Sequence, residues 1–163
     1  MIDLRRSGQR SFGEGFIEEE TANLWEPWMR QADQVLEDEK LVQAVYEALL
    51  KRHPKSRTRG RRGVAAEIVL RMMLLKHIRN WSFEVLEREV RPNLLYREFT
   101  RVGAGKVPDA KTLGRQALAL GPDVVKQILT PLALLMSRVP SLATLPTAPV
   151  IEKAPLWALM VKF

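Results

Sequence analysis

A chain of 163 residues, 46% of them hydrophobic, is long enough for one modest domain with a buried core, and its 26 basic and 19 acidic residues give a net charge of +7. The absence of cysteine excludes disulfides and cysteine-ligated metal sites, and we expect a cytoplasmic protein. Residues 1–16 lack the apolar core of a signal peptide, and no apolar run approaches the roughly 20 residues of a membrane span, so we expect no membrane association.

Residues 1–32 form an N-terminal extension of mixed charge in our interpretation, followed by a helical domain over residues 33–130. The extension ends with Trp25 and Trp28 on either side of Pro27. These tryptophans suit either stacking on nucleobases or packing at the edge of the domain. The acidic residues around them favour packing.

A first amphipathic helix is predicted over residues 39–52, with Asp38 as its N-cap. Its apolar residues recur at steps of three and four. The helix is expected to end before His53, because a residue that precedes proline disfavours the helical conformation.

Residues 51–62 are a strongly basic loop without a single acid. Its basic residues equal the net charge of +7, so the rest of the chain is balanced. Such a local excess indicates a polyanionic partner, and we favour nucleic acid over a merely solvated surface. The candidate contacts are Lys51, Arg52, Lys55, Arg57, Arg59, Arg61 and Arg62.

The centre of the chain predicts an all-α fold, a small bundle of short helices around one buried helix, with turns like those of a helix-turn-helix and disordered tails. The helix that begins at Val64 is apolar on nearly every side, which requires burial among other helices. Ser82 and Asp109 are suited to cap two later helices.

The last helices are predicted from the glycine and proline residues that interrupt them. A helix over residues 109–120 ends at Gly121-Pro122, and a further helix follows that Pro131 kinks or stops. Residues 131–163 hold five of the ten prolines and show no periodicity, so we predict a disordered tail, with a short helix up to Arg138 as an alternative for its first residues.

Several of these motifs, in this order, resemble the N-terminal domain of bacterial insertion-sequence transposases of the DDE class. The resemblance covers about residues 36–129. It rests on the Leu/Met-rich helix that ends at Leu75-Lys76, the Trp-Ser-Phe-Glu-Val-Leu-Glu run at residues 81–87, the Asn-Leu-Leu-Tyr-Arg-Glu-Phe run at 93–99 and the Pro-Asp-Ala-Lys-Thr-Leu run at 108–113. It implies a domain that helps to hold the DNA ends of the mobile element.

The resemblance implies that in intact members of that family a separate RNase H-like domain holds two metal ions on three carboxylates. The resemblance fades near Leu129, before the first catalytic aspartate is expected, and none of the aspartates here lies in a strand-like context. We therefore assign no catalytic residue and predict that the chain is not an enzyme. His53 and His77 lack partners at ligand spacing, so we expect no metal and no cofactor. His77 suits a partner for the helix dipole or a half-buried core position.

DNA binding is the function that these residues support. The basic loop would contact phosphates without reading sequence. The helix over residues 109–120 could read bases from the major groove, with Lys111, Thr112, Arg115 and Gln116 exposed, although the same side chains are equally well explained as solvated surface groups.

Two hypotheses follow. The first is the DNA-binding N-terminal module of a transposase, made as a truncated product without strand-transfer activity, whose partner is double-stranded DNA such as the terminal inverted repeats of the element. The second is a helical interaction module that associates with or inhibits an intact transposase, or forms a homo-oligomer. A relic without function is the remaining alternative.

Overall fold

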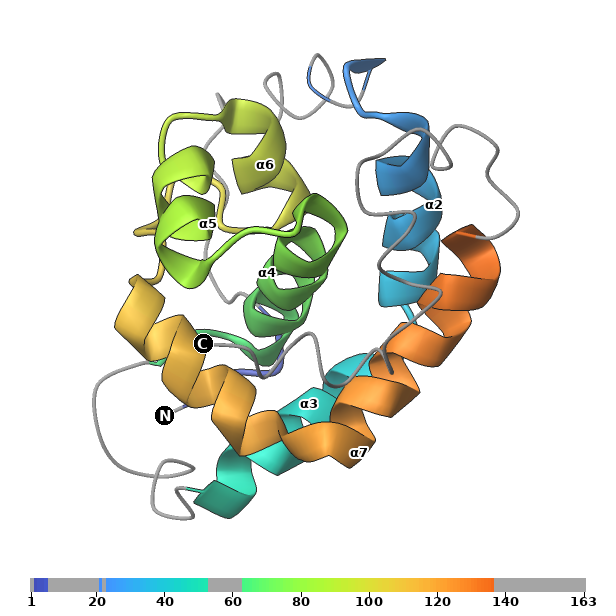
Figure 1. Cartoon of the computed structure of the whole chain (residues 1–163), viewed down its shortest axis with the longest axis vertical. Helices are drawn as coiled ribbons and strands as arrows, with labels where there is room; N and C mark the ends of the chain where they lie inside the picture. The colour runs from blue at the N-terminus through green and yellow to red at the C-terminus, as the bar shows by residue number, and fades with distance from the viewer. Residues whose placement is uncertain (1, 6–20, 22, 53–62, 137–163) are drawn as a thin grey trace.

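The computed structural model describes residues 2–5, 21, 23–52 and 63–136, and within these ranges it contains helices and no strand, which confirms the all-α prediction (Figure 1). Residues 6–20 and 137–163 of the predicted tails and residues 53–62 of the basic loop lie outside the described residues. The helices are α2 (Pro27–Leu36), α3 (Glu39–Arg52), α4 (Ala66–Arg79), α5 (Phe83–Val90), α6 (Leu94–Phe99) and α7 (Ala110–Met136).

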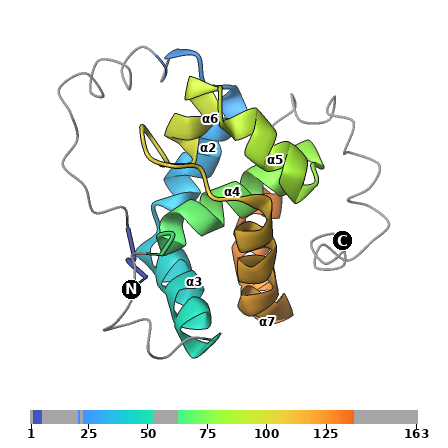
Figure 2. The ribbon, with the colours of Figure 1, turned by 90° about the vertical axis from the view of Figure 1, so that its left-hand side faces the viewer.

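Helix α4 is the buried helix at the centre of the bundle. Every residue from 69 through 75 is at most 2% exposed, including Leu70 and Leu74. The other helices lie around it (Figure 2). The apolar composition of this segment required burial on all sides, and the prediction of a central helix is confirmed.

Two predicted caps are formed in this part of the structure. The Ser82 hydroxyl accepts from the Val85 amide at 3.2 Å and begins α5. Asp38 Oδ1 accepts from the Lys40 amide at 2.9 Å at the start of α3. Each side chain satisfies one of the amides that the first turn of a helix leaves without an internal partner.

The folded unit begins before residue 33, because α2 starts at Pro27, which suits the first helical position. Trp28 is 3% exposed, and its ring meets Phe99 edge-on at 5.2 Å. The Trp25 ring lies 5.9 Å from the same Phe99 ring. Both tryptophans therefore pack on the core, as the packing interpretation predicted.

The N-terminus of α4 is capped by a distant segment. The amides of Ala66 and Glu67 donate to the carbonyls of Asp3 and Leu4 at 2.9 and 3.1 Å. Ala65, at the N-cap position, has no side-chain hydrogen bond to offer. A short stretch near the start of the chain thus completes the central helix.

Helix α7 bends at Gly121, where a positive φ of 70° interrupts the helical conformation, as the Gly121-Pro122 pair predicted. Figure 1 shows the two halves meeting at an angle. The helix does not stop at Pro131 but continues to Met136, because a proline removes one internal hydrogen bond without necessarily ending a helix. Within the described ranges, no helix has both the length and the apolar character needed to cross a membrane.

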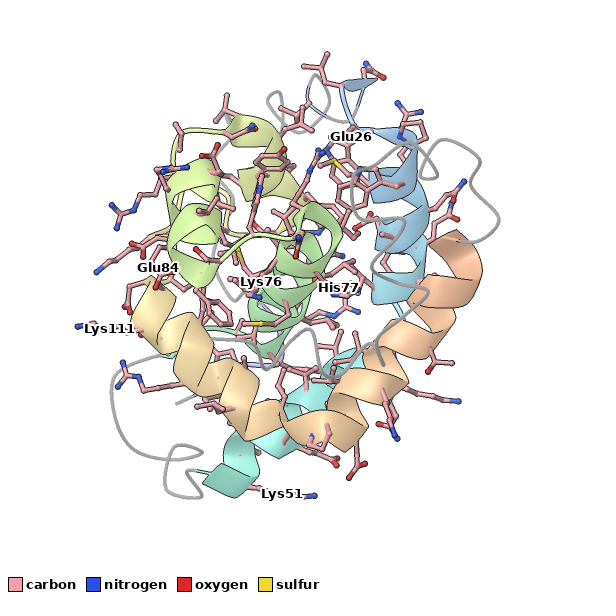
Figure 3. The ribbon with its side chains drawn as sticks, viewed as in Figure 1. Glu26, Lys51, Lys76, His77, Glu84 and Lys111 are labelled. Atoms are coloured by element: carbon pink, nitrogen blue, oxygen red, sulfur yellow. The ribbon has the colours of Figure 1, made fainter. Side chains whose placement is uncertain are left out.

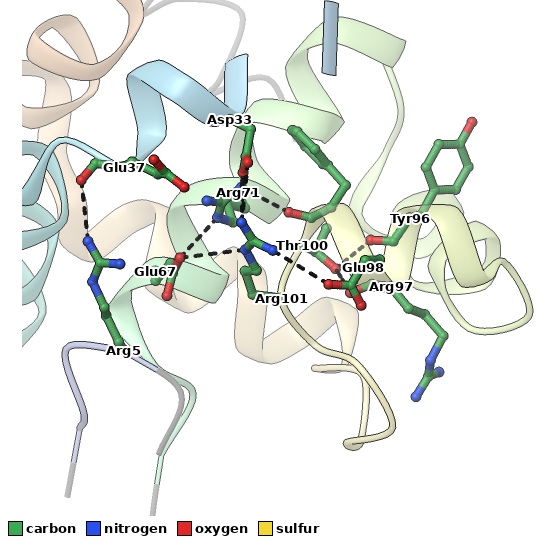
Figure 4. Close-up of polar contacts among 11 residues, drawn as sticks. Arg5, Asp33, Glu37, Glu67, Arg71, Tyr96, Arg97, Glu98, Thr100 and Arg101 are labelled. Atoms are coloured by element: carbon green, nitrogen blue, oxygen red, sulfur yellow. Dashed lines mark hydrogen bonds and ion pairs between the residues drawn. The ribbon is translucent and has the colours of Figure 1, made fainter. Parts of the chain in front are cut away.

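A fully buried guanidinium joins three parts of the chain (Figure 4). Arg71 of α4 is 0% exposed and pairs with Asp33 of α2, donates to Glu67 Oε1 at 3.2 Å, and donates to the Phe99 carbonyl of α6 at 3.1 Å. Arg101, after α6, donates to the same Asp33 carboxylate at 3.1 and 3.2 Å. We call Asp33, Glu67, Arg71 and Arg101 the Arg71 cluster.

Removal of the carboxylate that Arg71 and Arg101 share should be strongly destabilising. Asp33→Ala leaves a buried guanidinium without its main counter-ion, and we expect a loss of about 3–5 kcal/mol in the free energy of unfolding. Urea denaturation at neutral pH measures it. Glu89→Ala is the matched control, because Glu89 pairs with Arg88 on the surface, and we expect a loss below about 1 kcal/mol. Equal losses in both variants would contradict a structural role for the cluster.

Candidate nucleic-acid interface

The first two of the predicted basic contacts lie at the end of α3. Lys51 is exposed and points outward from the last turn of this helix (Figure 3). Arg52 is the last residue of α3. The other candidate contacts lie outside the described residues; they are Lys55, Arg57, Arg59, Arg61 and Arg62. The structure therefore places the first two residues of this run on the last turn of α3. The opposite face of α3 lies in the core.

A surface groove lies beside Lys51, between the end of α3 and the bend of α7. Ala48 and Lys51 line it from α3, and the bend contributes Leu118, Gly121 and Val124 among others. A β-carbon on Gly121 would meet no atom within 4 Å, so the bend is open on this side. The exposed start of the basic loop is thus adjacent to the bend of α7.

The first turn of α7 carries the second predicted contact surface. Asp109 Oδ1 accepts from the Thr112 amide at 2.8 Å, and Asp109 Oδ2 accepts from the Thr112 hydroxyl at 2.9 Å, so Asp109 is the predicted N-cap. The Arg115 guanidinium donates to the Thr112 hydroxyl at 3.4 Å and to the Lys111 carbonyl at 3.2 Å. Lys111 and Arg115 are exposed, as predicted.

Thr112 and Gln116 are less available than the sequence suggested. Both are half-buried, and the Gln116 Oε1 atom is buried. The Thr112 hydroxyl is already engaged by Asp109 and Arg115. The exposed polar part of the first turns of α7 therefore consists chiefly of Lys111 and Arg115.

Several other basic side chains in the described part of the chain serve the fold. Arg97 donates to the carbonyls of Arg91, Gly103 and Gly105 at 2.6–2.9 Å and so holds the turn between α6 and α7. Arg79 pairs with Glu26. The Arg71 cluster uses two more arginines. These arginines are committed to structural partners, whereas Lys51, Lys111 and Arg115 are among the basic side chains that remain exposed.

His77 and Lys76 lie near the end of α4. Burial lowers the pKa of His77, and the neighbouring Lys76 charge lowers it further, so a role as a charged partner of the helix dipole is disfavoured. Burial also lowers the pKa of Lys76, whose Nζ lies 4.8 Å from the centre of the Phe83 ring. Among the described residues, no group of three histidine or acidic side chains is arranged to hold a metal.

One contact between α5 and α7 was missed in the sequence. Glu87 Oε2 accepts from the Ala110 amide at 2.7 Å, across 23 positions of the chain. Glu87 belongs to the run at residues 81–87 and Ala110 to the run at 108–113, so two of the motifs that carry the family resemblance meet here. A cap supplied by another helix has no characteristic spacing, so no pattern in the sequence could have identified it.

A family model described as "Transposase domain (DUF772)" matches residues 23–117. The matched range begins just before α2 and ends within the first half of α7. No curated protein and no solved structure matches the chain significantly.

The cap of α7 makes a testable contribution to acid stability. The amide and then the hydroxyl of Thr112 lower the pKa of Asp109 below its ordinary value of 3.8. Because the folded pKa is the lower one, the stabilisation is complete above pH 3.8 and is lost as the pH falls through the folded pKa. We expect the Asp109 carboxyl to titrate below 3.8 in a carbon-detected NMR titration, and Thr112→Val to raise its midpoint. A midpoint that Thr112→Val leaves unchanged would contradict the contribution of the Thr112 hydroxyl, whereas a midpoint at or above 3.8 in the unaltered chain would contradict the cap itself.

Proposed function

The chain belongs to the transposase-domain family DUF772, and we propose that it is a DNA-binding module of a transposase that holds double-stranded DNA, such as the terminal inverted repeats of a mobile element. The proposal includes no strand-transfer activity of the module itself. In support, three of its aspartates already have structural partners: Asp33 binds Arg71 and Arg101, and Asp38 and Asp109 cap helices.

The observation that carries the proposal is the concentration of positive charge in the basic loop. The basic residues of residues 51–62 equal the net charge of +7, and no acid lies among them. Lys51 begins this run at an exposed helix end. Lysines and arginines of this kind bind phosphates by releasing condensed counterions, which gives strong affinity without sequence preference. Lys111 and Arg115 on α7 offer a second contact surface.

An interaction module is the second candidate function, and one feature of the surface favours it. Leu24 and Leu94 are 68% and 56% exposed, and both line one groove together with Pro92 and Leu95. An exposed apolar groove suits contact with an intact transposase or a second copy of the chain. Replacing residues 53–62 by an uncharged linker of equal length separates the candidates, since DNA binding would be lost while partner association would survive.

We expect the affinity for duplex DNA to fall steeply with salt. If about four to six side chains of residues 51–62 contact phosphates, the slope of log K against log salt is about −4 to −5. The quadruple variant Arg57→Ala, Arg59→Ala, Arg61→Ala and Arg62→Ala should flatten this slope by up to about three to four units, nearly one for each phosphate that the variant no longer binds. Fluorescence anisotropy of a labelled duplex over a salt series measures it.

The control for this experiment is the double variant Lys40→Ala and Lys126→Ala, which removes two exposed cations outside the loop. Its slope should stay within about half a unit of that of the unaltered chain. A folded quadruple variant with an unchanged slope would move the phosphate contacts away from the basic loop and refute this form of the proposal.

A further inference from the structure

Helices α5 and α7 meet through two neighbouring contacts, one apolar and one polar. A β-carbon on Gly114 of α7 would lie 3.8 Å from the Phe83 ring of α5, so this glycine faces the ring in ordinary contact. One helical turn away on both helices, Glu87 accepts from the Ala110 amide. Since Phe83 and Glu87 are four residues apart, as are Ala110 and Gly114, the two contacts lie on one face of each helix.

The Glu87 carboxylate binds in two directions from a largely buried position. Its side chain is 17% exposed; Oε2 accepts from the Ala110 amide and Oε1 pairs with Arg91 of the same helix. An acidic group at the start of a helix is favoured both by the free amides and by the helix dipole. The polar contact therefore fixes the beginning of α7 against α5.

A series of hydrogen bonds connects the first turn of α7 to the exposed Arg115 side chain. Asp109, which precedes Ala110, binds both the amide and the hydroxyl of Thr112. The same hydroxyl accepts from the Arg115 guanidinium. The position of Arg115, and of Lys111 beside it, thus depends on the turn that Glu87 holds in place.

We propose that Glu87 is a positioning residue for DNA binding: by holding the first turn of α7 against α5, it places Lys111 and Arg115 where they contact the phosphates of the duplex bound by the basic loop. This inference rests on the proposed DNA-binding function and adds α7 to its contact surface. Glu87 itself does not bind a phosphate in this proposal, because a carboxylate and a phosphate are both anions that only accept hydrogen bonds.

The sign of the effect distinguishes positioning from simple charge. An acidic side chain close to bound DNA repels the phosphates, so its removal should strengthen binding if charge alone matters. Removal of a positioning residue should instead weaken binding, because two cations no longer reach their phosphates. Glu87→Ala should therefore weaken binding and flatten the salt slope by up to about two units, one for each of Lys111 and Arg115.

Two variants isolate the hydrogen bond. Glu87→Gln removes the charge but keeps an oxygen that accepts from the Ala110 amide, so its slope should match that of the unaltered chain. Glu89→Ala removes an acid from the same helix, where Glu89 pairs with Arg88, and should leave the slope unchanged or the binding slightly tighter. Circular dichroism confirms that each variant is folded, and hydrogen exchange of the Ala110 amide should be faster in Glu87→Ala alone.

The outcomes are distinct. A flatter slope in Glu87→Ala with normal slopes in Glu87→Gln and Glu89→Ala supports the inference. Unchanged or tighter binding by folded Glu87→Ala, in a chain that does bind DNA, overturns the inference and leaves the proposed function standing. Absence of DNA binding by the unaltered chain overturns both.

Discussion

The burial of one positive charge constrains this fold more than any other single feature. The Arg71 guanidinium is fully enclosed, and its acceptors come from α2, from α4 and from the end of α6. A buried charge is tolerated only when its partners are in place, so these elements must come together correctly or the charge is left uncompensated. Arg101 reinforces the arrangement through the shared Asp33 carboxylate. The cluster therefore joins segments that are distant in the sequence around the apolar core of α4.

The bend at Gly121 allows α7 to pack against helices on two sides of the bundle. Helix α7 packs against α5, against α2 and most extensively against α3. The bend brings its middle beside Lys51, where the basic loop begins. Lys51 and Arg52, with which residues 51–62 begin, lie on α3, and Lys111 and Arg115 lie on the first turns of α7, so both belong to helices that pack against one another. The packing of α3 against α7 therefore fixes the place of Lys51 relative to the first turns of α7.

Local features of the fold were predictable from the sequence. The apolar composition of α4 indicated a buried helix, and Ser82, Asp38 and Asp109 were identified as caps because a cap acts on amides two or three residues away. The break at Gly121 followed equally from local chemistry.

Long-range polar contacts were not predictable, because their partners have no fixed spacing. Arg71 lies in an apolar run without any sign that Asp33, 38 positions earlier, would pair with it. Glu87 and Ala110 are related only through the packing of α5 on α7. Gln116 was expected at the surface from its polarity, whereas its oxygen is buried. For the candidate interface, the sequence identified the charge of the basic loop, and the structure placed its first two residues on the last turn of α3.

The most direct test of this account is a map of the amides that respond to DNA. A nitrogen-labelled chain titrated with a short duplex should show chemical-shift changes over residues 51–62 and over residues 110–115, with the Arg71 cluster unaffected. Such a pattern would mean that a fixed core presents both contact surfaces to one ligand. Changes confined to the groove at Leu24 and Leu94, or spread evenly through α4, would contradict it.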